Sequence, residues 1–272
     1  PQGAATRRVG TQFIAEVKSS AAKTRLIPFE FSTTQTYILE FGNTYIRFFK
    51  DKGQILSGGS AYEISSPYLT AELFDIKFAQ SADVMYITHP NHEVMKLSRT
   101  GHTSWTLAQV DFTDGPYLAT NSTTTTLTPA QAATGSNINI TASAVTGING
   151  GAGFQTTDVG RIISFNSGKA KITARSSTTV VACTITTAFT NTNATEAFNL
   201  GAFSDTTGHP SCVSFFEQRL VFAGTTDEPQ TLFFSKAGDY ENMTTGTNAD
   251  DAMVYTIASN QVNAIRYMKA VR

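Results

Sequence analysis

A unit of strand-forming residues that recurs along the chain constrains the fold more than any other sequence feature. Its clearest copy spans residues 211–235. Val213 and Phe215 alternate with polar residues, and the apolar run Leu220-Val221-Phe222-Ala223, a Gly/Pro-containing turn and the run Leu232-Phe233-Phe234 follow. Alternation indicates a half-buried strand, and short apolar runs between turn residues indicate buried strands. The unit therefore predicts a lead-in strand followed by an antiparallel pair.

Two earlier copies have the same order. In the first, an alternation at Phe29 and Phe31 precedes the runs 37–41 and 45–49, which the hairpin-type dipeptide Gly42-Asn43 separates. In the second, an alternation at Ile76 and Phe78 precedes the runs 83–87 and 93–97. Phe78 follows Phe31 by 47 residues, whereas Phe215 follows Phe78 by 137, which leaves about 90 residues beyond one period. A fourth unit is expected to begin at Ile265 and Tyr267.

The extra residues have a composition of their own. Residues 118–200 are rich in threonine and contain six charged residues in 83 positions. Apolar alternation at Ile138 and Ile140, and again at Ile162, Ile163 and Phe165, argues for a packed core. We expect strands at 137–142, 161–165, 169–175, 179–186 and 196–200, arranged as a small antiparallel barrel or sandwich. Loop tips tolerate such an insertion when its two ends lie close together.

The predicted fold class is all-β. Repeats of 40–50 residues with several strands each are typical of propeller blades, so we expect a partial β-propeller of about three blades with an inserted domain. The expected domains are residues 1–117 with the N-terminal strand region and first blades, 118–203 as the insert, and 204–272 with a further blade and the start of the next. The chain begins with Pro1, and we expect a truncated fragment of a longer protein.

Composition excludes several classes of function. The net charge of −1, with 15% charged residues, gives no general basic field for nucleic acid. Cys183 and Cys212 are too few for a disulfide framework and are expected to be buried thiols. No apolar run approaches the ~20 residues that span a bilayer, so no membrane anchor is expected.

The N-terminal region holds the candidate contact residues. Residues 13–18 alternate well enough to predict a short strand. The five basic residues fit either a solvated face or a patch that contacts a partner or a phosphate backbone; they are Arg7, Arg8, Lys18, Lys23 and Arg25.

Several stretches of the chain resemble the tail tubular protein B, or tail nozzle, family of short-tailed bacteriophages and related prophages. They are PQGAATRRVGTQFIAEVK (1–18), residues 25–49, DFTDGPYL (111–118), HPSCVSFFEQRLVFAG (209–224) and SKAGDYEN (235–242). The insert segment FQTTDVGRIISF (154–165) is similar to the small β-domain of the first catalytic-cysteine half-domain of ubiquitin-activating enzymes. The resemblance implies a propeller platform in a hexameric ring that contacts a tail adaptor and tail fibres and lets DNA pass without sequence-specific binding. It also implies a virion tail location after synthesis in the bacterial host cytoplasm.

Three groups of residues invite a chemical interpretation. His89 and His92 have an i, i+3 spacing, but both fall in a predicted hairpin turn and lack further ligands at matching spacing. Asp250-Asp251 lacks the alternating oxygen ligands of a calcium loop. Glu217 could act as a general acid or base with a second carboxylate, although a turn beside the hydrogen-bonding Arg219 explains it as well.

The residues therefore predict no catalytic group, metal or cofactor, and the resemblance implies a structural virion protein rather than an enzyme. The alternative is a tail protein that binds or degrades bacterial surface polysaccharide, for which Glu217 would be the test residue. A third possibility is adhesion to cells by the Thr-rich insert.

Overall fold

A computed structural model describes residues 10–32, 34–258, 261 and 263–270 of the chain. Its regular elements are β-strands and two short 3-10 helices, η1 (Asn149–Gly151) and η2 (Thr156–Asp158), so the protein is all-β as predicted. No helix within these described ranges is long and apolar enough to cross a membrane. The chain forms two compact units, the first made of the residues up to Phe74 with Gln80–Met85 and Leu97–Leu107, and the second made of the remainder.

The first sheet arises from the first sequence unit. Its strands follow one another in the order β1-β2-β3-β4, and β7 also pairs with β3; the bounds are β1 (Arg25–Glu30), β2 (Thr36–Gly42), β3 (Tyr45–Lys50), β4 (Gly53–Gln54) and β7 (Glu63–Ser65). The β2–β3 hairpin turns at Asn43 and Thr44, because Gly42 pairs with Tyr45. Gly42 is required there, since a Cβ at this position would overlap the Tyr45 ring. A separate two-stranded ribbon joins β5 (Leu56–Ser57) to β6 (Ser60–Ala61).

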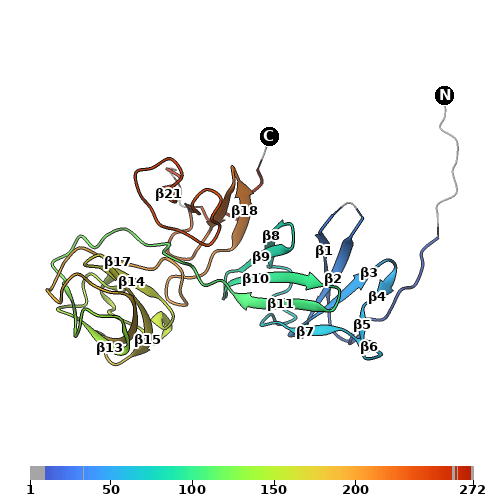
Figure 1. Ribbon diagram of the computed structural model, residues 1–272, viewed down its shortest axis with the longest axis horizontal. Helices are drawn as coiled ribbons and strands as arrows, with labels where there is room; N and C mark the ends of the chain where they lie inside the picture. Colours follow the sequence, from blue (N-terminus) through green and yellow to red (C-terminus); the bar gives the residue numbers. More distant parts are fainter. Residues whose placement is uncertain (1–9, 33, 259–260, 262, 271–272) are drawn as a thin grey trace. The chain divides into compact units, whose positions relative to one another are not determined.

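The second sequence unit forms another antiparallel sheet (Figure 1), in the order β11-β10-β9-β8. Its strands are β8 (Lys77–Ser81), β9 (Val84–His89), β10 (His92–Gly101) and β11 (Ser104–Gln109). The boundary between the two compact units passes through these strands. Pro90 and Asn91 form the predicted turn between β9 and β10.

The core of the first unit is aromatic. Trp105, the only tryptophan of the chain, stacks on Phe48 at a ring-centroid distance of 4.5 Å. It meets the rings of Phe29 and Tyr37 edge-on, at 4.8 and 5.2 Å. These rings are buried, and such pairs add about 0.5–1.5 kcal/mol each beyond their buried area.

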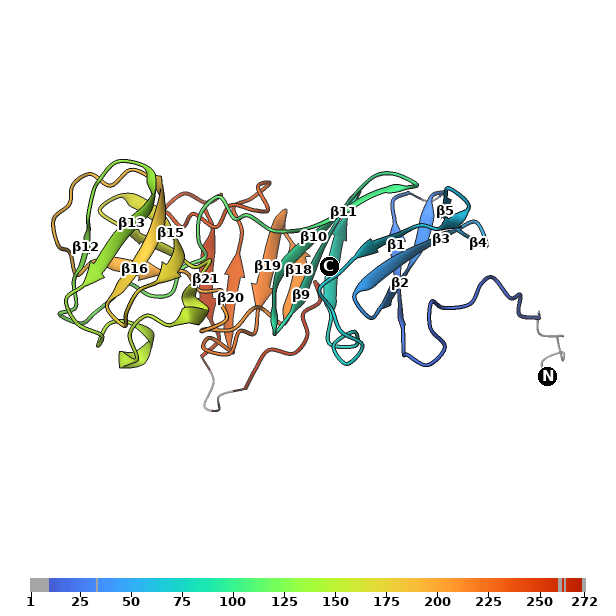
Figure 2. The same ribbon diagram turned by 90° about the horizontal axis from the view of Figure 1, so that it is seen from below.

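The Thr-rich segment forms its own sheet in the order β12-β13-β16-β15-β14-β17 (Figure 2), with β12 (Leu127–Pro129), β13 (Gly135–Ala142), β14 (Ile162–Phe165), β15 (Gly168–Arg175), β16 (Val180–Thr187) and β17 (Phe198–Leu200). Five of the six strands match predicted ones, and β12 was not predicted. Leu127 and Thr195 exchange backbone hydrogen bonds of 2.9 and 3.1 Å, which joins the first strand to the residues ahead of the last and curls the sheet. One continuous apolar cluster, drawn from Leu127 to Leu200, fills its interior.

The third sequence unit forms the sheet β18-β19-β20-β21. The strands are β18 (Cys212–Phe216), β19 (Arg219–Ala223), β20 (Thr231–Phe234) and β21 (Met253–Thr256), and the central β19 is buried along its whole length. This sheet and the two earlier units thus share the sequential antiparallel order expected of propeller blades.

Two expected strands do not form. Residues 13–18 form no strand, because no described strand pairs with their backbone; they are exposed apart from the half-buried Ala15. Ile265 and Tyr267, expected to open a fourth unit, lie in a segment without strand structure. There the Ile265 amide donates to the carbonyl of Pro229 at 2.8 Å instead of to a lead-in partner.

Candidate functional site

Of the five basic residues predicted to contact a partner or DNA, Arg7 and Arg8 lie outside the described residues. Lys18 forms an ion pair of 2.6 Å with Glu63, and Arg25 donates to the carbonyl of Leu73 at 2.8 Å. Lys23 is exposed. The structure therefore gives Lys18 and Arg25 roles within the first unit and does not gather them with Lys23 into one site, and a contact with DNA or a partner stays a prediction.

Glu217 lies where the turn interpretation placed it. It forms with Gln218 the two-residue turn between β18 and β19, and both have positive φ, 45° and 61°. Such turns match the twist of the strands that they connect. Glu217 is exposed at this turn, and the next residue, Arg219, is buried.

The other candidate residues of the sequence are held by local contacts. The His89 Nδ1 accepts a hydrogen bond of 3.1 Å from the Asn91 amide in the β9–β10 turn. Asp250 and Asp251 each lie 3.3 Å from the ammonium of Lys236. Cys183 and Cys212 are buried, and burial raises the pKa of the Cys183 thiol to about 12. A thiol with so high a pKa is inert at neutral pH.

A polar hub that the sequence did not single out surrounds Asp114. The residues ahead of the insert run beside the third sheet, where the Met243 amide donates to the Asp114 carbonyl at 2.9 Å. The Asp114 carboxylate accepts hydrogen bonds from Tyr117 at 2.6 Å and from Thr244 at 2.9 Å, and it pairs with Lys169 at 2.7 Å. Asp114 thereby connects the residues ahead of the insert with the insert itself and with the loop of the third sheet that contains Met243 and Thr244.

The protonation of this hub follows from its contacts. Burial alone would raise the pKa of Asp114, but the hydrogen bonds from Lys169, Tyr117 and Thr244 outweigh it and hold that pKa below its usual value. Burial, followed by the hydrogen bond to Asp114, raises the pKa of the Tyr117 hydroxyl. Asp114 is therefore an ionised acceptor at neutral pH with its oxygens already engaged, which suits neither a general acid nor a cation ligand.

A cavity of the second unit lies beside this hub. It has a volume of about 540 Å³ and is lined mostly by polar side chains, among them Asp114, Tyr117, Thr120, Ser164, Asn199, Glu228, Thr231, Thr244, Thr245 and Thr256. Glu228 accepts a hydrogen bond of 2.7 Å from Thr231. The cavity offers hydroxyl and amide groups, and the residues that line it do not include Glu217.

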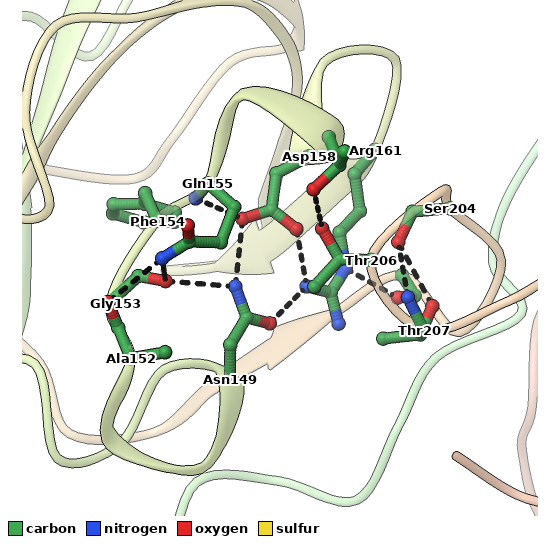
Figure 3. A network of polar contacts seen from close by, with 12 residues as sticks. Asn149, Ala152, Gly153, Phe154, Gln155, Asp158, Arg161, Ser204, Thr206 and Thr207 are labelled. Carbon is green, nitrogen blue, oxygen red and sulfur yellow. Dashed lines mark hydrogen bonds and ion pairs between the residues drawn. The ribbon is translucent and has the colours of Figure 1, made fainter. Parts of the chain in front are cut away.

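A second network is buried in the insert (Figure 3). The Arg161 guanidinium donates to Asp158 at 2.9 Å, to the Asn149 side chain at 2.7 Å and to the Gly201 carbonyl at 2.6 Å. Asp158 also accepts from the Gln155 amide at 2.7 Å. Both charged side chains are fully buried. Burial lowers the pKa of Arg161, and the charge of Asp158 acts in the opposite direction.

The sequence contained a signal for these residues. Asp158, Arg161 and Lys169 are three of the six charged residues in the Thr-rich segment. The few charged residues of a segment with so little charge are expected to form pairs, because burying an unpaired charge is costly. Asp114 carries no such signal, since only the fold brings it to Lys169.

The chain was compared with known proteins. No family model matches it, and no curated protein matches it.

Proposed function

We propose that the protein is a structural component of a bacteriophage tail that assembles into a ring around the path of the ejected DNA. The observation that carries the proposal is the repetition of one antiparallel sheet order in three sequence units, the last of which follows the separate sheet of the Thr-rich segment. This repetition supports the propeller platform that the resemblance to tail nozzle proteins implies.

The use of polar groups is in keeping with a structural role. Asp114 and Arg161 each bond to a segment that is distant in sequence, Asp114 to Lys169 and Arg161 to the Gly201 carbonyl. Catalytic groups need a pKa matched to proton transfer, whereas the hydrogen bonds at Asp114 lower its pKa further below neutrality. A rigid wall benefits from such fixed contacts.

The charge of the chain also suits a DNA conduit. With a net charge of −1, the protein has no strong general attraction for phosphates, and Lys18 already has Glu63 as a partner. DNA that moves past such a wall is held only weakly.

The test is assembly with neighbouring tail proteins. The protein is co-purified with the products of the genes that flank its reading frame and is viewed by negative-stain electron microscopy. Rings with an axial channel, and labelling of virion tails by an antibody against the chain, are expected. Monomers at every mixing ratio would contradict the proposal.

A second candidate function is polysaccharide binding or degradation, favoured by the polar cavity beside Asp114. Hydroxyl and amide groups at a cavity wall are the partners that sugars use. This function requires the protein to bind or cleave capsular polysaccharide or peptidoglycan, measured by co-sedimentation and by release of reducing ends. It also requires Asn199→Ala to weaken binding while Glu217→Gln leaves it unchanged.

A further inference from the structure

The outer edge of β21 is an unprotected strand edge. All four residues of β21 are exposed, with Tyr255 at 63%, Met253 at 46% and Val254 at 45%. β20 pairs with one side of β21, and no other described strand pairs with its opposite side. Natural edge strands usually carry lysine, proline or a bulge that prevents further pairing, and the sequence Met-Val-Tyr-Thr carries neither lysine nor proline.

The first unit contains a segment suited to such an edge. Residues 13–17, Phe-Ile-Ala-Glu-Val, alternate as a strand does, yet they pair with no described strand. Phe13 is 76% exposed and Ile14 is 40% exposed. The segment is anchored at its end by Lys18, whose amide donates to Glu40 at 3.4 Å and whose ammonium pairs with Glu63. It is thus a strand-forming sequence without a sheet.

The charges around the two elements are complementary. Residues 204–257, which include β21, contain eight acidic and two basic residues. Residues 7–25 contain five basic residues and one acidic residue. In an antiparallel pairing of residues 13–17 with β21, Lys18, which pairs with Glu63 in its own unit, would lie at the end of the strand that Asp250 precedes, whose carboxylate is 58% exposed beside Lys236. Opposite charges that meet in this way fix register and speed association.

We propose that residues 13–17 of a second copy of this chain add as a strand to the outer edge of β21. Main-chain hydrogen bonds would supply the affinity and alternate side chains the register, as in other cases of strand addition. The contact is heterologous, so that repeated addition closes a ring when the rotation allows it. The proposal deepens the ring assembly proposed above and rests on it, because it names the surfaces through which neighbouring copies meet.

Complementing variants test the contact. Ala15→Pro blocks the donor segment, because proline removes an amide and is poorly tolerated within a sheet. Val254→Lys with Tyr255→Lys blocks the edge, and Phe216→Lys, at an exposed residue of β18, is the matched control. Sedimentation velocity over a range of concentrations measures the assembly of each protein and of a one-to-one mixture of the two blocked variants. Circular dichroism shows whether each variant is folded. Phe13→Ser with Val17→Ser is a second variant of the donor segment, used if Ala15→Pro does not fold.

The expected result is asymmetric. The wild type and the Phe216→Lys control form dimers and larger species, and each blocked variant associates at least about tenfold more weakly, equivalent to about 1.4 kcal/mol. The mixture forms dimers and nothing larger, because each mixed pair has one working donor and one working edge.

Three outcomes would overturn the proposal: a wild type that stays monomeric, blocked variants that assemble as the wild type does, or a mixture that stays monomeric. Assembly with the flanking gene products separates this failure from that of the proposed function. If blocked variants still enter rings there, the ring stands and the strand contact is wrong.

Discussion

Two buried arginines, one in the insert and one in the third sheet, have their hydrogen bonds satisfied in different ways. Arg161 is 2% exposed and pairs with the buried carboxylate of Asp158. Arg219 is 6% exposed and donates to the main-chain carbonyls of Ser235, Asp251 and Ala249, at 2.7, 2.6 and 2.6 Å. The first arginine completes an ion pair inside the curled sheet of the insert, and the second holds a loop against a sheet.

The difference shows what each region needs. The insert has a continuous apolar core, so its buried pair must be complete, because a single buried charge costs more than the pair. The loop ahead of β21 ends in an exposed strand, and its carbonyls at Ala249, Asp250 and Asp251 accept hydrogen bonds from Arg219. Its position therefore depends on the planar donors of Arg219, which lysine cannot reproduce.

The largest effect is expected from Arg161→Met. It leaves Asp158 buried without its cation, and we expect a loss of about 3–5 kcal/mol of unfolding free energy. Urea unfolding, monitored by hydrogen exchange in β13 to β16, measures this loss of unfolding free energy. The matched control is Arg175→Met, since Arg175 donates to one carbonyl, that of Phe154. Equal losses in the two variants would refute a special role for the buried pair, and Asp158→Asn added to Arg161→Met should restore part of the loss.

A smaller and more local effect is expected from Arg219→Met. It leaves four carbonyls without this donor, which costs about 1–3 kcal/mol, and it should speed amide exchange in residues 249–256 more than in β18. Hydrogen exchange with mass spectrometry measures both regions. Arg219→Lys keeps the positive charge but not the planar set of guanidinium donors. It should therefore restore only part of the protection against amide exchange. Unchanged exchange at β21 would show that the loop is held by other contacts.

The smallest effect is expected at Asp114, and it depends on pH. The folded-state pKa of Asp114 is below its usual value, so its contribution is present above the unfolded pKa of about 3.9 and is lost as pH falls through the folded pKa. Asp114→Asn should therefore cost about 1 kcal/mol at pH 7 and less at pH 2.

Urea unfolding at the two pH values measures this difference. Asp111→Asn is the control, because the Asp111 side chain is 94% exposed and lies 3.8 Å from Lys171. A cost at Asp114 that is the same at both pH values would show that packing, and not charge, holds the hub.

The sequence predicted most of the strands because each strand carries its own signal. Leu220 to Ala223 and Ile162 to Phe165 show apolar patterns that survive in any packing. Strand pairing at 13–18 was predicted wrongly, because local alternation cannot supply a partner strand. The hub at Asp114 was also beyond prediction, since Lys169 and Thr244 reach it from sequence distances of 55 and 130 residues. The turn role of Glu217 was one of two interpretations, and its positive φ agrees with the turn.

The ends of the Thr-rich segment meet at one point of the chain. Tyr117 forms an antiparallel bridge with Gly201, and the Leu118 amide donates to the Leu200 carbonyl at 2.8 Å. If recombination replaced all the residues between these two pairs, the new segment would only have to keep Tyr117 and Leu118 beside Gly201 and Leu200. We therefore expect the segment to behave as a cassette that related genes exchange whole, so that differences among them accumulate there faster than in the sheets that carry it.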